Sequence, residues 1–477
     1  MRSGEEILLL TENVHLLTKE QAWHYRVLPK GGTDLRMELY CEAGAEEDSL
    51  AAELEVLLGK EVLLEPVPVT SIARLLSKYY LRDNAVESAT QLQLSNHADD
   101  FLENLIAEAK NLKSSDIHIE RYEHKCRVRI RIDGNMVERY LLKNDDYPAL
   151  INKIKIYANL DIAEKRLPQD GRINFKSGGN QFDIRVSVLP TLYGEKVVLR
   201  LLNNDATDID LNSLGFSRFD LENYLQGVKR PNGILLISGP TGSGKTTTLY
   251  ATLKLLNKET RNILTIEDPV EYTLEGINQV QLKESIGLGF AAALRTFLRQ
   301  DPDVIMVGEI RDPETANMAI RAALTGHLVL STIHTNSAWG TVSRLIDMGI
   351  PPFLVANTLS TTVAQRLIRL LCPHCKTLHD FNNSMYPRQY RPSRDVAHHY
   401  KPHGCEQCYY TGYKGRKAVY EVIPIDLELA EEIKKGNANI HGLLSERGIH
   451  TLAENAFDIF SEGLTSIDEI YPLLFNY

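Results

Sequence analysis

The chain has 477 residues, of which 43% are apolar and 24% charged, as in ordinary globular proteins. This length predicts about three domains, and the net charge of -10 gives no overall attraction to nucleic acid or anionic lipid. No apolar run approaches the roughly 18 residues of a membrane-spanning helix, and the acidic start is wrong for a signal peptide. We therefore expect a cytoplasmic protein that reaches membranes only through partners.

Residues 1–82 are predicted to form a small N-terminal domain of short strands and helices. Apolar spacing indicates helices at 48–58 and 71–80. Nothing in this stretch suggests chemistry, so we expect a packing module or one that docks a partner. Residues 81–96 are polar, which predicts a linker, and a helix is expected near 98–112.

Residues 97–205 are predicted to form a second domain that contains β-strands. In 125–132, apolar residues alternate with three arginines, which predicts a strand with one buried face. A second alternating strand covers 181–188, where Arg185 points outward, and Arg200 lies on the apolar run 197–202. From the residues alone, such arginines indicate a solvated strand face. A polar linker is expected at 203–216.

A glycine-rich loop at 239–246 dominates the domain predicted at 217–370. It has the pattern G-x-x-x-x-G-K-T and lies between an apolar run and a helix-forming segment, as in a phosphate-binding loop. Its backbone N–H groups can surround phosphate oxygens, Lys245 can reach the β- and γ-phosphates, and Thr246 can contact Mg²⁺. The residues expected to bind nucleotide are Gly239, Pro240, Thr241, Gly242, Ser243, Gly244, Lys245, Thr246 and Thr247.

Four strand-like segments in this domain alternate with helical ones, at 234–238, 262–266, 304–308 and 328–333. That alternation predicts a mostly parallel sheet covered by helices on both faces. Ligands bind at the carboxyl ends of such strands, where polar clusters begin at Glu267, Glu309 and His334.

These strand ends offer groups for nucleotide hydrolysis, which needs Mg²⁺, a carboxylate that orients and deprotonates water, and cations. We expect Glu309 to contact Mg²⁺ through water and Glu267 to be the general base, although the two roles are open to exchange. His334 is the expected phosphate sensor, whereas His327 is expected to brace a turn.

Two arginines lie one helical turn apart, at Arg295 and Arg299. Alone, this spacing indicates a solvated charged face. Beside a phosphate-binding loop, it is also the arrangement of a charge donor that acts in trans.

Four cysteines form two C-x2-C pairs, which in a cytosolic chain favours a structural zinc site over disulfides or free thiols. Four thiolates leave a tetrahedral Zn²⁺ no open position. The nearby His374, His379 and His403 are competing candidates that a four-cysteine site does not need. The zinc would staple the polar stretch 381–404, which is expected to have little core of its own. The predicted ligands are Cys372, Cys375, Cys405 and Cys408.

These motifs occur together in one known family, and the chain resembles its members, the GspE/PulE type of secretion ATPases that serve type II secretion and type IV pilus assembly. The resemblance covers about residues 97–420 and continues more weakly to the end. It rests on the phosphate-binding loop, the tetracysteine and six further segments, at 115–120, 131–134, 162–172, 265–271, 301–312 and 324–336. Ser337 stands where the family often has Asp.

The resemblance implies an α/β fold: a RecA-like ATPase domain, a PAS-like domain at 97–205, a zinc subdomain at 371–410 and a helical C-terminal part at 411–477. It also implies a homo-hexamer in which five arginines approach nucleotide within or between subunits. These arginines are Arg185, Arg200, Arg295, Arg299 and Arg311.

The function implied is a Mg²⁺-dependent ATPase that drives pseudopilus or pilus assembly at the cytoplasmic face of the inner membrane. The N-terminal domain would dock the cytoplasmic domain of a membrane platform protein. ATP is favoured over GTP because the guanine-selectivity motif N-K-x-D does not occur. The tetracysteine favours an assembly motor, because retraction motors of this family typically lack it. The weaker alternatives are a nucleic-acid motor and a non-hydrolysing switch.

Overall fold

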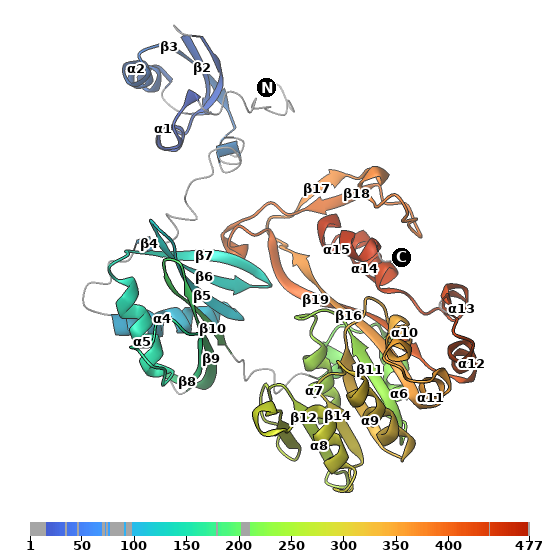
Figure 1. Cartoon of the computed structure of the whole chain (residues 1–477). Helices are drawn as coiled ribbons and strands as arrows, with labels where there is room; N and C mark the ends of the chain where they lie inside the picture. Colours follow the sequence, from blue (N-terminus) through green and yellow to red (C-terminus); the bar gives the residue numbers. More distant parts are fainter. Residues whose placement is uncertain are drawn as a thin grey trace. The chain divides into compact units, whose positions relative to one another are not determined.

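The computed structural model describes residues 16–33, 36–44, 47–68, 72, 75–76, 90–91, 98–177, 180–201, 210–437 and 439–475. The chain divides into two compact units near residue 201 (Figure 1). Among the described residues, no helix is long and apolar enough to cross a membrane.

The first unit begins with a three-stranded sheet in the order β1-β2-β3. Strand β2 pairs antiparallel with β1 and parallel with β3, and Leu28, Leu39 and Leu54 are fully buried in the core of this fold. Helix α2 confirms the helix predicted at 48–58. Of the helix predicted at 71–80, the structure describes only Ile72, Leu75 and Leu76, which are helical and buried; the rest lies outside the described residues. The bounds are α1 Lys19–Tyr25, β1 Leu28–Gly32, β2 Arg36–Glu42, α2 Glu47–Leu58 and β3 Glu61–Val67.

A seven-stranded sheet follows in the same unit, in the order β4-β7-β6-β5-β10-β9-β8. Its central strands pair antiparallel, and residues such as Ile117, Val128 and Leu199 form the buried face. The strands predicted at 125–132, 181–188 and 197–202 and the helix near 98–112 are confirmed. The bounds are β4 Thr90–Gln91, α4 Ala98–Asn111, β5 Asp116–Arg121, β6 Cys126–Ile132, β7 Asn135–Leu142, α5 Tyr147–Tyr157, β8 Gln169–Ser177, β9 Asn180–Thr191 and β10 Gly194–Leu201.

The second unit contains another seven-stranded sheet, in the order β13-β12-β14-β15-β11-β16-β19. The six strands from β13 to β16 pair in parallel, and β19 is antiparallel to β16. All four predicted strands are present. The bounds are β11 Gly233–Ser238, β12 Ile263–Glu267, β13 Asn278–Gln281, β14 Val304–Val307, β15 Leu328–Ile333, β16 Leu359–Leu371 and β19 Tyr413–Pro424.

Two hydrophobic cores lie on the two faces of this sheet, as predicted. Alternate residues of β11 serve each core: Ile234 and Leu236 face one, and Leu235 and Ile237 face the other. Helices α6 and α7 pack on one face, and α8, α9 and α10 on the other. The helix bounds are α6 Arg218–Val228, α7 Lys245–Leu256, α8 Phe290–Phe297, α9 Pro313–Leu324, α10 Gly340–Asp347 and α11 Pro352–Thr358.

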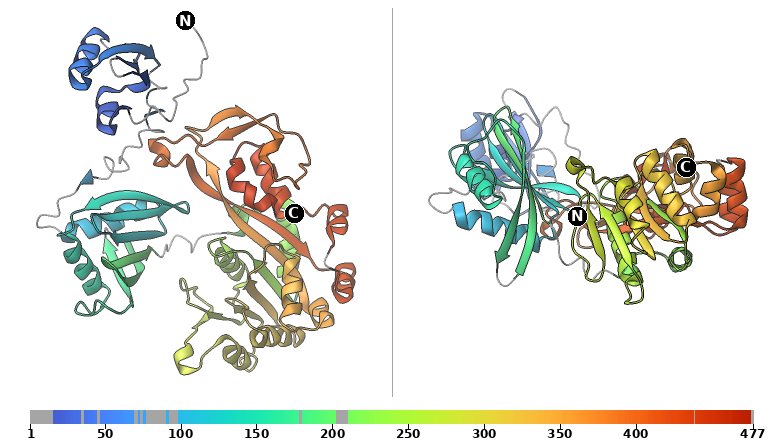
Figure 2. Two further views of the ribbon diagram at one scale, coloured as in Figure 1. Left: turned by 45° about the horizontal axis from the view of Figure 1, so that its top comes forward. Right: turned by 60° about the horizontal axis from the view of Figure 1, so that its bottom comes forward.

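The C-terminal stretch 411–477 is not entirely helical, which corrects the sequence-based expectation. It opens with β19, which runs beside β16 as a long ribbon (Figures 1 and 2). Helices occupy the remainder, because the apolar spacing changes from two to about 3.6 residues after Pro424. They are α12 Leu427–Lys435, α13 His441–Glu446, α14 Leu452–Ser461 and α15 Ile467–Leu474.

The segment between the cysteine pairs also differs from the expectation of little core. Strands β17 (Thr377–Asp380) and β18 (His398–Lys401) pair antiparallel. Phe381 packs edge-to-face against Phe460 of α14, and Tyr386 packs at a tilt against Phe457, with ring centroids 5.4 and 6.1 Å apart. Aromatic packing therefore attaches this segment to the C-terminal helices.

Candidate nucleotide and metal sites

The glycine-rich loop connects β11 to α7 at the carboxyl end of the parallel strands. Gly239, Gly242 and Gly244 have φ values of 150°, 81° and 88°, in the range that favours glycine. A Cβ atom on Gly239 would lie 2.4 Å from the backbone oxygen of Gln365. Helix α7 begins at Lys245 without a side-chain cap among the described residues. Its first N–H groups are thus available to an anion.

Lys245 lies over this loop with its ammonium Nζ 2.8 Å from the oxygen of Gly239 and 3.0 Å from that of Pro240. Burial lowers the pKa of Lys245; the charge of Glu309 opposes this shift, and the charge of Arg366 adds to it. Both Glu309 and Arg366 therefore lie close enough to Lys245 to influence its charge. Arg366 comes from β16, and sequence patterning did not predict its presence here.

Glu267 ends β12 and is only 3% exposed. Its carboxylate accepts hydrogen bonds from the Tyr250 hydroxyl, from Thr265 Oγ1 at 2.6 Å and from Gln279 Nε2 at 3.1 Å. A carboxylate offers about four acceptor positions. Three of those on Glu267 are occupied, so its orientation is fixed and little of it remains open.

Glu309 follows β14 and is the more open of the two carboxylates. Its side chain is 15% exposed, pairs with Arg311 and lies 3.5 Å from Nε2 of His334. Thr246 is exposed in the first turn of α7. The Thr246 hydroxyl and the Glu309 carboxylate are hard oxygen donors of the kind that Mg²⁺ prefers, so the residues present fit this ion.

The two histidines that flank the strand 328–333 have different surroundings. His327 Nδ1 is 2.8 Å from the oxygen of Ala322 and 3.1 Å from Thr325 Oγ1, so it braces the turn before β15, as predicted. His334, at the opposite end of β15, is half-exposed beside Glu309.

The predicted arginines fall into two groups. In the second unit, Arg295 pairs with Glu314, and Arg299 Nη1 donates to the oxygen of Arg295 at 3.0 Å. In the first unit, Arg200 and Arg185 are cross-strand neighbours on β10 and β9. Arg200 Nε donates to Asp116 Oδ1 at 3.0 Å, yet 61% of its side chain remains exposed.

Several charged or polar partners in these surroundings were not predicted from the sequence. Asp116 was missed although it lies directly before Ile117, out of phase with the buried Ile117 and Ile119, which places it on the same sheet face as the arginines. Gln365 was missed because β16 was not predicted; its Oε1 accepts from Thr248 Oγ1 at 2.9 Å, beneath the glycine-rich loop.

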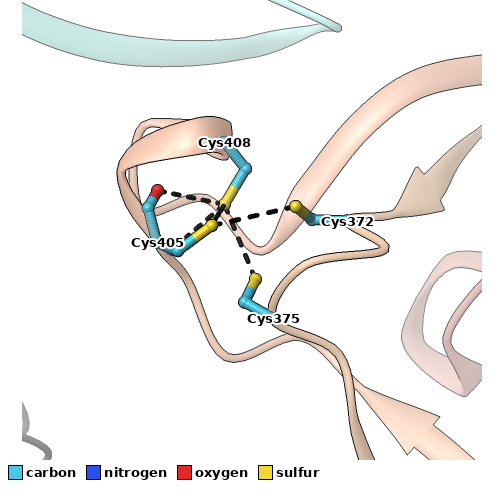
Figure 3. Close-up of side chains that lie close together, drawn as sticks. All are labelled: Cys372, Cys375, Cys405 and Cys408. Carbon is cyan, nitrogen blue, oxygen red and sulfur yellow. Dashed lines mark hydrogen bonds between the residues drawn. The ribbon is translucent and has the colours of Figure 1, made fainter.

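The four predicted cysteines point toward one another (Figure 3). Their sulfur atoms all lie within 4.8 Å, and three of the Sγ–Sγ distances are 3.9, 3.7 and 3.8 Å. Tetrahedral Zn–S bonds of about 2.3 Å would place the sulfur atoms about 3.8 Å apart. Among the described residues the cluster contains no histidine. The donor set therefore fits a structural zinc ion.

The chain matches known proteins over most of its length. The model of the family described as "Type II/IV secretion system protein" matches residues 93–472. Type II secretion system protein E of Klebsiella pneumoniae is 40% identical over 460 residues, which cover 91% of this chain and 92% of that protein. The protein of the same name from Dickeya dadantii is 46% identical over 368 residues, covering 77% and 73%. The type IV pilus assembly ATPase PilB of Myxococcus xanthus is 48% identical over 373 residues, covering 77% and 66%.

Two solved structures share the fold. The ATPase DotB of Legionella pneumophila has a TM-score of 0.62 at 20% identity, covering 82% of this chain and all of that one. The pilus retraction motor PilT with bound ADP has a TM-score of 0.53 at 26% identity, covering 78% and 96%. The RecA-like α/β fold predicted for the ATPase domain is thereby confirmed. With its phosphate-binding loop and this extent of similarity, the chain belongs to the type II/IV secretion system protein family and is an ATP hydrolase.

Proposed function

We propose that this chain is a Mg²⁺-dependent, hexameric ATPase that powers pseudopilus or pilus assembly for type II protein secretion at the cytoplasmic face of the inner membrane. The observation that carries the proposal is the placement of Lys245, Glu309 and His334 at one end of the parallel sheet, beside a glycine-rich loop. The similarity to secretion proteins E over 77–91% of this chain supports the secretion context.

In this proposal, the loop 239–247 binds the phosphates of ATP through backbone N–H groups, and Lys245 neutralises their charge. Mg²⁺, when bound through Thr246 and Glu309, would stabilise charge on the phosphates. Glu267 accepts a proton from water through its remaining acceptor position, and its three hydrogen-bond donors fix its orientation. His334 detects the γ-phosphate.

The arginines supply the positive charge that completes the site in a closed ring. Arg295, Arg299 and Arg311 act from the ATPase domain, and Arg185 and Arg200 from the domain at 97–205. Hydrolysis would then be coupled to motion between subunits, because docking is needed to bring these charges to the nucleotide.

The remaining parts follow the predicted domain plan. Residues 1–82 dock the cytoplasmic domain of a membrane platform protein, and the subdomain 371–410 holds a structural zinc. Extension of a type IV pilus is the alternative context, which the similarity to PilB favours. Nucleic acid is not proposed as a partner, because the chain has a net charge of -10.

The proposal is tested by steady-state ATP hydrolysis of the full-length chain and its Lys245→Ala variant. We expect a loss of at least about 100-fold, because the cation facing the phosphates is removed. Lys258→Ala, an exposed lysine just after the same helix, is the matched control and should keep the wild-type rate. Unchanged hydrolysis in Lys245→Ala would overturn the proposed site. Stimulation by acidic phospholipid with a membrane-protein domain supports the secretion role, whereas salt-sensitive stimulation by DNA contradicts it.

A further inference from the structure

The loop that follows His334 is held by side chains from three strands. This sensor loop, residues 334–339, connects β15 to α10. Ser238 Oγ of β11 lies 3.4 Å from the oxygen of Ser337, and Arg366 Nη2 of β16 donates to the oxygen of Asn336 at 3.2 Å. Glu421 Oε1 of β19 accepts from the backbone N–H of Ala338 at 2.9 Å. The cationic Arg366 thus holds one carbonyl of the sensor loop, and the anionic Glu421 holds one of its N–H groups.

Glu421 also contacts a second helix. Its other oxygen, Oε2, accepts from the backbone N–H of Leu452 at 3.1 Å, and Leu452 is the first residue of α14. The side chain is 4% exposed. A carboxylate at a helix N-terminus is stabilised by the unpaired N–H groups and the helix dipole. One buried carboxylate therefore joins the sensor loop to the start of α14.

Helix α14 packs against residues 376–404, the segment between the two cysteine pairs, which we call the cysteine segment. Phe460 packs edge-to-face on Phe381 with ring centroids 5.4 Å apart, and the ring centroids of Phe457 and Tyr386 are 6.1 Å apart. A displacement of α14 would therefore move aromatic side chains of the segment between the cysteine pairs. The contacts form a continuous path from His334 through Glu421 to that segment.

A cavity of about 170 Å³ lies along this path. It is lined by Asn336, Trp339, Glu421, Leu444, Leu452 and Leu473. Protein interiors are otherwise close-packed, so packed elements shift between discrete arrangements and need space to do so. The cavity provides such space between the sensor loop and α14.

We propose that Glu421 is a positioning residue that transmits movement of the sensor loop to α14 and the cysteine segment during the ATPase cycle. The inference rests on the proposed role of His334 as the phosphate sensor. Arg366 contributes as well, since it contacts the sensor loop and influences Lys245.

The test uses Glu421→Gln in the full-length chain. The amide keeps the size of the side chain but places an NH₂ group against one of the two backbone N–H groups, so one of the two contacts is lost. We expect kcat to fall about 10-fold, while KM and the affinity for a fluorescent ATP analogue stay within about twofold. The matched control is Glu454→Gln, which weakens the capping box of α14: among the described residues Glu454 hydrogen-bonds to Thr451 and not to the sensor loop. This control should lower the melting temperature and leave kcat unchanged.

Hydrogen exchange provides a readout that a merely structural role would not change. In the wild type, a non-hydrolysable ATP analogue should slow exchange both in residues 334–345 and in 452–461. In Glu421→Gln the slowing should remain in the first segment and disappear from the second. Slowing in both segments of the variant, or an unchanged kcat, would overturn the coupling. Absence of slowing at 334–345 in the wild type would instead contradict the sensor role of His334.

If Glu421→Gln fails to fold, Glu421→Asp replaces it. The shorter carboxylate keeps the charge but cannot reach both N–H groups at once. As in Glu421→Gln, the ATP analogue should slow exchange in residues 334–345 but not in 452–461, and the fall in kcat should be smaller. Retention of the exchange effect in α14 would contradict the proposal.

Discussion

The two seven-stranded sheets carry their charged residues in different places. In the antiparallel sheet of the first unit, Asp116 and Glu120 lie on a sheet face among arginine and lysine side chains. In the mostly parallel sheet of the second unit, Glu267 and Glu309 lie at or just after strand ends, and Lys245 begins the helix that follows the glycine-rich loop. Parallel topology gathers strand ends at one edge, whereas a sheet face gathers residues by register. The first arrangement therefore builds a charged sheet face, and the second a set of charged groups at one edge of the sheet.

The roles of Glu267 and Glu309 at the strand ends are distinguished most clearly by neutralising the two carboxylates separately. Glu267→Gln and Glu309→Gln should each lower kcat by about 10²–10⁴-fold. The variant that has lost the base should still bind ATP with Mg²⁺-dependent affinity, whereas the one that has lost the metal contact should lose that dependence. We expect the first behaviour in Glu267→Gln and the second in Glu309→Gln. Binding titrations with and without Mg²⁺, together with steady-state rates, measure both.

Glu275→Gln is the control, because Glu275 is an exposed carboxylate in the connection between β12 and β13. It should change neither rate nor binding. The reverse behaviour of Glu267→Gln and Glu309→Gln would exchange the two roles. Full activity in Glu267→Gln would remove that residue as the base.

Sequence patterning could predict which strand ends gather at this edge because its rule is topological. Buried apolar strands such as 304–307 are continuous runs, and the polar residue that ends each run marks the ligand edge. The roles of the carboxylates did not follow, because two of the three donors to Glu267 come from α7 and β13, and no local pattern connects Tyr250 or Gln279 to it.

The long ribbon of β16 and β19 was missed for another reason. Strand β16 buries Ser360, Thr361 and Thr362 completely, and such polar residues are typical of surfaces. The Ser360 hydroxyl is satisfied by the oxygen of Ile234 on the neighbouring strand, at 2.9 Å. A buried polar strand of this kind is recognisable only when its partner is known. Arg366 and Glu421 were missed with it.

Removal of the proposed zinc should affect the stability of the two units differently, because the cysteine segment belongs to the second unit. Chelation, or Cys375→Ser, should destabilise residues 372–412 and α14 by several kcal/mol. The antiparallel sheet should keep its protection. Hydrogen exchange with and without chelator measures both regions, and metal content of the purified chain identifies the ion. Cys126→Ser, which alters a cysteine outside the cluster, should leave the metal content unchanged. Equal destabilisation of both sheets would contradict the expected difference.

The antiparallel sheet should instead be sensitive to acid through Glu120. Burial alone would raise the pKa of this carboxyl group, but hydrogen bonds from Arg129, Lys196 and Arg127 lower it to about 2. A carboxyl group whose pKa is lower in the folded state stabilises the fold above its unfolded value near 4.5, and this stabilisation is lost as the pH falls toward 2. The shift corresponds to about 3 kcal/mol.

Glu120→Gln tests this dependence. The wild type should be more stable than the variant at pH 7, and the difference should shrink as the pH falls from about 4.5 to 2. Thermal unfolding followed across this range measures it. Glu123→Gln, an exposed neighbour, should show no such trend. A difference in stability that does not vary with pH would mean that the charge of Glu120 does not hold these cations.

The smallest expected effect concerns Asp116, and it decides whether the charged face serves catalysis or only stability. Asp116→Asn weakens the contacts to Arg131 and Arg200, which lie 3.4 and 3.0 Å from its oxygens. Arg200 is 61% exposed, so solvent screening should limit the loss of stability to about 1 kcal/mol or less. If Arg200 acts on nucleotide in the assembled ring, the ATPase rate should still fall several-fold, because the guanidinium loses its fixed position. The rate of a ring-forming preparation, compared with that of Arg200→Lys, distinguishes the alternatives. A fall in stability without a fall in rate would assign this face to folding alone and leave the strand ends as the sole source of catalytic charge.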